Sequence, residues 1–240
     1  MTEFIHSGEE KKKYVQKMFD DISPRYDFLN HFLSLGIDLY WRRQLVKSLG
    51  IIKGQKILDV ATGTGDVGFA ILRHHDVQVV GLDYAYNMTV IGRNKAIQRK
   101  ITSFDFLQGD GENLPFPDST FDALTISYGF RNIGHYDIAL AEFFRGLAPN
   151  GTLAILEFSV PRSKLFGLLY RFYFNHVLPK LAGLFSRKSA YRYLPESVQE
   201  FPERQEVLEM MKNAGFIQCS FKDLTFGVTS IFSGHIPLES

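Results

Sequence analysis

The sequence predicts an α/β fold built on a mostly parallel seven-stranded sheet with an antiparallel edge strand and helices on both faces. From residue 56 onward, short apolar runs alternate with amphipathic stretches of helical length, which is typical of parallel strands joined by crossover helices. The first of these runs ends in a glycine-rich loop. Because 45% of the 240 residues are hydrophobic, the chain can also bury the core of one large domain.

The first 50 residues are expected to be helical. Three segments have helical apolar spacing: residues 9–19, 26–35 and 38–49. Asp38 is predicted to cap the third helix, because a short carboxylate at this position accepts hydrogen bonds from free backbone N–H groups. Residues 1–50 are therefore predicted to form a cap or lid, and residues 51–240 the main domain.

Seven runs of the main domain are predicted as strands: residues 56–60, 77–82, 104–108, 121–127, 151–158, 216–221 and 225–232. The helices between them are predicted at residues 66–73, 86–100, 136–147 and 203–214. The last two strands are expected to form the antiparallel edge. A long aromatic stretch interrupts the alternation, and residues 161–202 are predicted as a helical insert over the substrate side.

The loop after the first strand carries a nucleotide-binding pattern. Gly63, Gly65 and Gly68 have the G-x-G-x-x-G spacing of Rossmann-like folds, at a point where a strand ends and a helix begins. Asp83 follows about 20 residues later, at the end of the next strand, where a carboxylate can bind the hydroxyls of a ribose. Both a nicotinamide-dependent oxidoreductase and an S-adenosylmethionine-binding protein fit this pattern.

The charges of the loop favour S-adenosyl-L-methionine. NAD brings a diphosphate, which the flanking carboxylates of Asp59 and Asp66 would repel. S-adenosylmethionine brings a sulfonium and an ammonium, which Asp59 can attract, while its carboxylate takes the N–H groups at the helix start. After the third strand, Asp110 stands among small residues, where its side chain can accept a hydrogen bond from an adenine amino group. The predicted cofactor is therefore S-adenosyl-L-methionine.

Four stretches together resemble the C-methyltransferases of ubiquinone and menaquinone biosynthesis: residues 57–66, 109–132, 147–159 and 191–202. The first is shared widely among methyltransferases, whereas residues 130–132 and 191–197 are specific to quinone methylation. The resemblance covers about residues 14–235 and implies a Rossmann-like class I methyltransferase fold. Carried over position by position, it implies cofactor contacts at Thr64, Asp83, Asp110, Gly111 and Ser127, with close backbone approach at Gly63 and Gly65.

The resemblance also implies a reaction, the methylation of a reduced polyprenylated quinone precursor that turns demethylmenaquinol into menaquinol. A quinol is nucleophilic at ring carbon mainly as its phenolate, so the enzyme must lower a phenol pKa of about 10 or accept the proton. Arg131 is expected to stabilise the phenolate, and Tyr26 to hydrogen-bond the ring oxygen. The structural alternatives are a loop ion pair for Arg131 and lid packing for Tyr26.

Three functional alternatives stay open. The acceptor could be the polyprenylated methoxybenzoquinol of ubiquinone synthesis, since the choice of head group depends on the dimensions of the pocket. An NAD-dependent oxidoreductase and a non-catalytic cofactor-binding scaffold are the other two. The chain departs from the family at Asp38 and Leu39, where a His-Arg pair is usual. This departure bears on the substrate more than on the reaction class.

The composition of the chain limits which ligands and partners it can bind. Lys and Arg number 27 against 26 Asp and Glu, so the sequence predicts no basic surface for nucleic acid. The single cysteine, Cys219, excludes an internal disulfide framework and fits a reducing cytoplasm. The 7 histidines show no ligand spacing with carboxylates, so no metal is predicted. A homodimer is compatible with the sequence.

The aromatic insert suggests contact with an apolar substrate. No apolar run reaches the ~20 residues of a membrane span. Aromatic residues of the insert are expected to line a channel for an isoprenoid tail, and its basic residues to touch an anionic membrane surface transiently. The enzyme is then expected to be cytoplasmic and peripheral at the inner face of the membrane. An amphipathic core helix with solvated basic residues is the alternative.

Overall fold

The computed structural model describes residues 8–23, 34, 36–161 and 188–238. Its helices are α1 (Gly8–Ile22), α3 (Ile37–Ser48), α4 (Asp66–Leu72), α5 (Tyr86–Gln98), α6 (Tyr136–Gly146), α9 (Lys188–Gln199) and α10 (Arg204–Asn213). Its strands are β1 (Lys56–Val60), β2 (Gln78–Asp83), β3 (Phe104–Gln108), β4 (Phe121–Ser127), β5 (Leu147–Phe158), β6 (Ile217–Leu224) and β7 (Thr229–His235). Two short 3-10 turns are η2 (Phe130–Asn132) and η4 (Thr225–Gly227).

The strands form one sheet in the order β3-β2-β1-β4-β5-β7-β6. The first five strands pair in parallel, and β7 runs antiparallel to both β5 and β6. The predicted mostly parallel sheet with antiparallel pairing toward one edge is thereby confirmed. The chain runs outward from β1 to β3 and then restarts on the other side of β1 with β4. At such a reversal, open α/β sheets bind ligands beyond the carboxyl ends of the strands.

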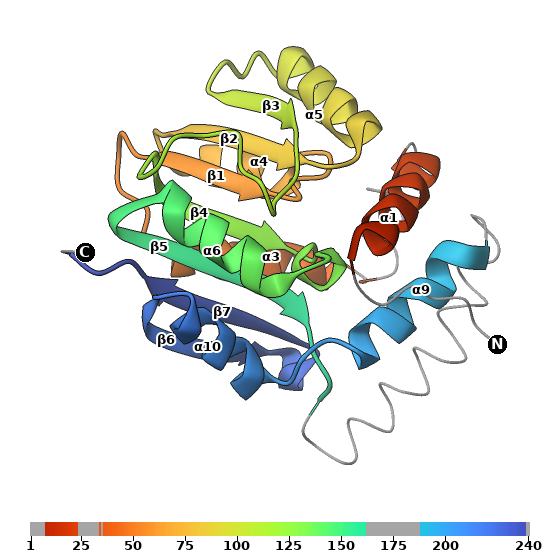
Figure 1. Cartoon of the computed structure of the whole chain (residues 1–240). Coiled ribbons are helices and arrows are strands. Elements are labelled where there is room, and N and C mark those ends of the chain that lie inside the picture. The colour runs from red at the N-terminus through yellow and green to blue at the C-terminus, as the bar shows by residue number, and fades with distance from the viewer. Residues whose placement is uncertain (1–7, 24–33, 35, 162–187, 239–240) are drawn as a thin grey trace.

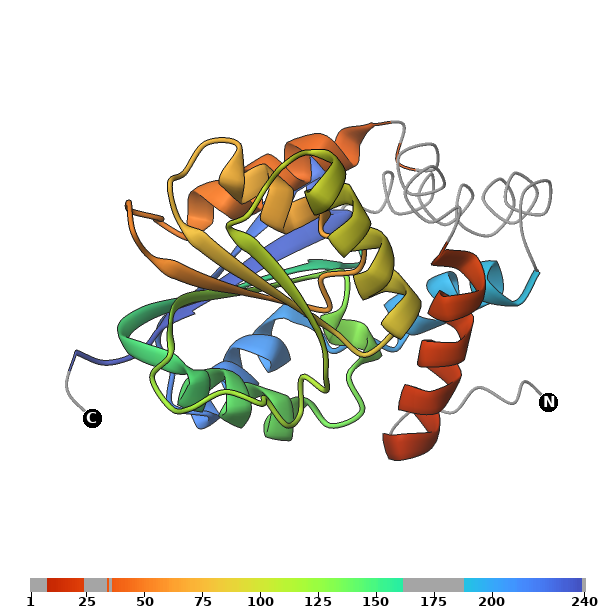
Figure 2. The ribbon, with the colours of Figure 1, turned by 90° about the horizontal axis from the view of Figure 1, so that it is seen from above.

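Helices cover both faces of the sheet (Figures 1 and 2). α3, α4 and α5 lie on one face, and α6 and α10 lie on the other. Successive residues of β1 alternate between the two layers, so that Ile57 packs on the side of α3, α4 and α5, and Leu58 on the side of α6 and α10. α1 stands apart from both layers, across the carboxyl ends of the strands (Figure 2). The sheet is thus well covered on its faces, and α1 is placed to cover its ligand-binding end.

The predicted start of the last strand is wrong. Thr225 and Phe226 belong to η4, with left-handed φ values of 47° and 57°, and β7 begins only at Thr229. The alternation of Phe226 with Val228 is typical of a half-buried strand, but Phe226 is 76% exposed. The turn instead lets Trp41 Nε1 donate to Thr225 Oγ1 at 2.7 Å. It therefore fastens α3 to the antiparallel edge.

The predicted cap role of Asp38 is also wrong. Gly36 is the N-cap of α3, in the left-handed conformation with φ 77°. Asp38 lies in the first turn and is buried, where it accepts from Ser34 Oγ at 2.6 Å and pairs with Arg42 at 3.1 Å. α3 itself packs on the sheet through buried Trp41 and belongs to a helical layer of the main domain. The helix predicted over residues 26–35 and most of the predicted insert lie outside the described residues.

Candidate active site

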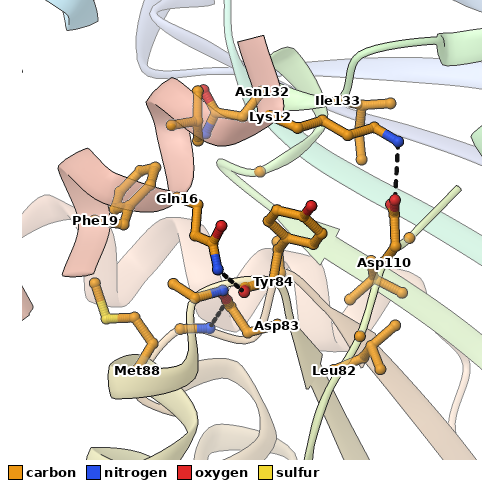
Figure 3. Close-up of a pocket in the computed structure, with 18 of the residues that line it drawn as sticks. Lys12, Gln16, Phe19, Leu82, Asp83, Tyr84, Met88, Asp110, Asn132 and Ile133 are labelled. Atoms are coloured by element: carbon orange, nitrogen blue, oxygen red, sulfur yellow. Dashed lines mark hydrogen bonds and ion pairs between the residues drawn. The ribbon is translucent and has the colours of Figure 1, made fainter. Parts of the chain in front are cut away.

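A cavity lies at the carboxyl ends of β1, β2 and β4 (Figure 3). Its walls come from the loops after these strands, from the loop after β3 and from one face of α1. The empty space measures about 760 Å³, part of it open to solvent. The position of this cavity fits a nucleotide-like cofactor, because open α/β sheets bind such ligands at the carboxyl ends of their strands.

The glycine loop takes the form that the sequence pattern predicts. Gly63 and Gly65 have positive φ values of 57° and 89°, which a residue with a Cβ adopts only with strain. A Cβ on Gly65 would also approach Phe106 Cζ to 2.7 Å. Gly63 lines the cavity, whereas Gly65 is the N-cap that turns the chain into α4. The backbone of the loop can therefore come close to a ligand.

Asp59 lies beneath this loop rather than in the cavity wall. It is 1% exposed and accepts a hydrogen bond from Thr62 Oγ1 at 2.6 Å. Burial raises the pKa of Asp59 to about 7, against the opposing effect of hydrogen bonds from Thr62 and the backbone of Gly68. Its position supports a role in shaping the loop more than a direct attraction to a sulfonium.

Burial of Asp59 should make stability depend on pH. The native pKa of about 7 exceeds the unfolded value, so the unfolded state loses this proton first as the pH rises. The free energy of unfolding should fall between about pH 4 and about pH 7, by up to about 1.4 kcal/mol per pH unit from this group. Asp59→Asn keeps an acceptor for Thr62 and should flatten the profile, as measured by urea unfolding at several pH values. Parallel profiles for the two proteins would contradict this origin.

Asp83 ends β2 and faces the cavity. Its carboxylate accepts from the N–H groups of Gly63 at 2.7 Å and Ala85 at 2.8 Å, and burial raises its pKa to about 6 against the opposing effect of these hydrogen bonds. Ser127, at the end of β4, is half-buried and lines the cavity as well. The structure thus brings together two predicted residues that stand 44 positions apart in the chain, together with Gly63.

Asp110 and Gly111 line the cavity from the loop after β3. Asp110 Oδ1 accepts from the N–H of Glu112 at 2.9 Å. Asp110 Oδ2 pairs at 2.8 Å with the ammonium of Lys12, which belongs to α1 (Figure 3). The carboxylate expected to bind adenine is therefore held from two sides.

Thr64 and Asp66 are engaged outside the cavity wall. Lys95 Nζ donates to Thr64 Oγ1 at 2.8 Å and lies 3.4 Å from Asp66 Oδ1. Arg42 pairs with Asp66 at 3.1 Å. The charge of Asp66 is thus compensated by two cations that are distant in sequence. The repulsion of a diphosphate expected from this carboxylate is correspondingly weaker, and the acidic residues at the cavity wall are Asp83, Asp110 and Glu112.

Sequence reasoning missed the wall contributed by α1. Lys12, Val15, Gln16 and Phe19 all line the cavity, and their i, i+3, i+4, i+7 spacing places them on one face of the helix. Gln16 Nε2 donates to the carbonyl of Tyr84 at 3.2 Å (Figure 3). The spacing alone is also that of a core-facing stripe, so the pattern did not reveal a ligand site.

Arg131 forms a buried ion pair. Its Nη1 lies 2.7 Å from Glu157 Oε1, and its N–H donates to Glu157 Oε2 at 3.1 Å. Arg131 Nη1 also donates to the carbonyl of Tyr128, a residue with a left-handed φ of 55° at the end of β4. Tyr128 and Asn132 line the cavity, whereas Arg131 stands behind them. The ion pair considered as the structural alternative for Arg131 is therefore present, and Tyr26 lies outside the described residues.

Neither a metal centre nor a membrane span is found in the parts of the chain that the structure describes. There, no group of three or more His, Cys, Asp and Glu side chains is placed to hold a metal ion. Likewise, none of the helices in the described ranges is long and apolar enough to cross a membrane.

The polar groups that line the cavity fit S-adenosylmethionine. Carboxylates of Asp83 and Asp110 can accept from hydroxyl and amino groups, and the loop of Gly63 offers backbone to a zwitterion. The walls also need residues without side chains. A Cβ on Gly111 would meet Val60 Cγ1 at 3.0 Å, and one on Gly129 would meet Ala61 Cβ at 2.4 Å.

Comparison with known proteins decides the family. Residues 6–236 match the model of the ubiE/COQ5 methyltransferase family. The chain belongs to this family. A relative from Thermus thermophilus, named demethylmenaquinone methyltransferase, is 50% identical over 223 residues, which are 92% of this chain and 100% of the relative. A relative from Geobacter sulfurreducens, named ubiquinone/menaquinone biosynthesis C-methyltransferase UbiE, is 45% identical over 233 residues, 96% and 91% of the two chains.

Solved structures agree on the fold of this ubiE/COQ5 methyltransferase. Phosphoethanolamine N-methyltransferase 2 of Haemonchus contortus, in complex with S-adenosyl-L-methionine, has a TM-score of 0.64 at 15% identity, over 82% of this chain and 52% of that one. A SAM-dependent methyltransferase from Aquifex aeolicus has a TM-score of 0.61 at 17% identity, over 81% and 89%. The Rossmann-like methyltransferase fold is confirmed. As a member of the ubiE/COQ5 methyltransferase family, the enzyme uses S-adenosyl-L-methionine as its methyl donor.

Proposed function

We propose that this enzyme methylates a ring carbon of a reduced polyprenylated quinone precursor, converting demethylmenaquinol into menaquinol. The family match over residues 6–236 carries this proposal. The 50% identity to a relative named demethylmenaquinone methyltransferase favours the naphthoquinol over the methoxybenzoquinol head group. Relatives at 44–46% identity are named for both quinones, so the benzoquinol is the second candidate substrate.

The cofactor contacts are assigned from the cavity. Asp83 accepts from the ribose hydroxyls and Asp110 from the adenine amino group, both as carboxylates that line the wall. Gly63, Gly111 and Ser127 contribute close backbone or hydroxyl contacts at the same wall. Thr64, Gly65 and Asp59 shape the loop from outside the cavity, since none of them lines it. All eight positions predicted from the sequence then belong to one site, in two different roles.

We assign the quinol, which receives the methyl group, to the side of the cavity where β4 ends. When bound, S-adenosylmethionine supplies an electrophilic methyl group for in-line transfer. Tyr128 and Asn132 line this side, and Asn132 Oδ1 accepts from the hydroxyl of Tyr193 at 2.9 Å. Arg131 is held behind them by its ion pair with Glu157, which offsets much of its positive charge. We propose that the remaining positive potential favours the phenolate form of the quinol. Tyr26 is proposed to hydrogen-bond the ring oxygen.

The isoprenoid tail needs an apolar path outside this cavity. We assign it to the insert over residues 161–202, whose aromatic content suits a prenyl chain. Transient contact of the insert with an anionic membrane surface, a cytoplasmic location and a homodimer are parts of the same proposal. Residues 188–199 of this insert form α9, beside η2.

The substrate assignment can be tested with the purified enzyme. The protein is incubated with S-adenosylmethionine and either demethylmenaquinol or the demethylated benzoquinol, each kept reduced, and products are identified by mass spectrometry. We expect a mass gain of one CH2 unit with the naphthoquinol, because the methyl group replaces a ring hydrogen that leaves as a proton. We expect no gain with the oxidised quinone, because only the quinol carbon is nucleophilic. Methylation of the benzoquinol alone would replace the first candidate by the second. If neither quinol is methylated while the cofactor binds, the proposed function is overturned.

A further inference from the structure

Helix α1 bridges the cofactor cavity from one rim to the other. At its amino end, the N–H of Gly8 donates to the carbonyl of Gly134 at 3.4 Å, and Lys11 Nζ donates to that of Ile133 at 2.9 Å. Near its other end, Asp20 Oδ1 accepts from the N–H of Asn87 at 3.1 Å. The helix therefore rests on the η2 loop and on the start of α5, with the cavity between these supports.

Lys12 lies at the middle of a charge cluster on this helix. Its ammonium lies 2.8 Å from Asp110 Oδ2, 2.8 Å from Glu112 Oε2 and 3.0 Å from Glu9 Oε1, so its three N–H donors have three acceptors. The Lys12 side chain is 9% exposed, whereas that of Glu9 is 65% exposed. Asp110 and Glu112 are thus the inner partners, and Glu9 the outer one.

Two carboxylates that share one ammonium would repel each other without it. Glu112 is independently fixed, because its Oε1 accepts from the N–H groups of Gly134 at 2.7 Å and His135 at 3.0 Å. Asp110 is less restrained, being 28% exposed and held otherwise by the N–H of Glu112. If the ammonium were lost, repulsion from the fixed carboxylate would displace Asp110 rather than Glu112.

We propose that Lys12 is a positioning residue of the cofactor site, which holds the Asp110 carboxylate where it selects the 6-amino group of adenine. Selectivity for the purine thus depends on a helix that precedes the sheet in the chain. The proposal rests on the proposed adenine contact of Asp110. It is independent of the quinol assignment, because it concerns cofactor binding alone.

The test compares two ligands by isothermal titration calorimetry of the full chain. The probes are S-adenosylhomocysteine and its analogue whose purine lacks the 6-amino group. The wild type should prefer the adenine compound by roughly tenfold or more, the effect of one hydrogen bond to a charged group. Lys12→Met should reduce this preference to near unity, because the variant keeps the length of the side chain but loses its charge.

Two control variants separate positioning from folding. Lys12→Arg keeps the positive charge and should retain most of the preference, while Glu9→Gln removes only the exposed partner and should leave it unchanged. Thermal midpoints of all variants report whether the protein as a whole keeps its stability. If Lys12→Met weakens both ligands equally, Lys12 merely docks α1 and the proposal is overturned. If the wild type itself shows no preference for the adenine compound, Asp110 does not contact the 6-amino group, and the proposal is overturned because its premise fails.

Discussion

Glu157→Ala is expected to destabilise the protein by about 3–5 kcal/mol, the cost of breaking a buried ion pair by removing one partner. Glu157 is completely buried, and its carboxylate binds both the side chain and the backbone N–H of Arg131. The variant leaves the Arg131 guanidinium, whose side chain is 7% exposed, without its counter-ion. Urea unfolding of the variant and the wild type measures the loss. Asp76→Ala is the matched control, because the Lys53–Asp76 pair is exposed and should contribute little.

The double variant Arg131→Leu with Glu157→Leu should recover most of this stability, since it leaves neither charge buried. It also tests the proposed catalytic role of Arg131 without the uncompensated carboxylate that Arg131→Ala alone would create. We expect a folded protein that binds S-adenosylhomocysteine but has lost most of its methyl transfer at saturating quinol. Unchanged turnover in the folded double variant would contradict a role of Arg131 in stabilising the phenolate. Failure to regain stability would instead show that the pair is required for the geometry of η2.

Asp83→Ala is expected to weaken cofactor binding by at least about a hundredfold. One carboxylate serves two ribose hydroxyls in the proposed site, and each hydrogen bond to a charged group contributes about 1.5–3 kcal/mol. The same change removes the acceptor for the N–H groups of Gly63 and Ala85, so the glycine loop also loses a restraint. The affinity for S-adenosylhomocysteine, measured by calorimetry, reports the combined effect.

Asp105→Ala provides the control for this substitution. Asp105 is an exposed carboxylate on the neighbouring strand β3 and does not line the cavity. Its loss should leave cofactor affinity within experimental error of the wild type. If Asp83→Ala binds the cofactor as well as Asp105→Ala does, the ribose contact is not made by Asp83.

The parts of the site that were predictable from the sequence depend on local pattern. An apolar run that ends in Gly63 and Gly65 fixes both a strand and a tight turn, because only glycine adopts those φ values without strain. Asp83 is the last residue of β2 and Asp110 comes two residues after β3, so the parallel topology alone brings them to the same edge. This is why the cofactor site could be outlined without coordinates.

The parts that escaped prediction depend on pairing between distant residues. Nothing in the sequence near Asp66 indicates that Arg42 and Lys95 compensate its charge. In the sequence, Asp59 looks as acidic as any other aspartate. Its burial in β1 raises its pKa to about 7, and the sequence pattern does not indicate this. Lys12 joins Asp110 across 98 positions of the chain. Such partners follow from tertiary packing, which hydrophobic periodicity does not encode.

The bridge formed by α1 has a consequence for the order in which this enzyme is assembled. α1 is the first described helix to be synthesised, yet its hydrogen-bond partners include Tyr84, Asp110 and Ile133. It can dock only after β2, β3 and η2 exist, because loop closure over such distances follows the formation of more local contacts. During synthesis, more than half of the chain must therefore emerge before the cofactor cavity gains its last wall.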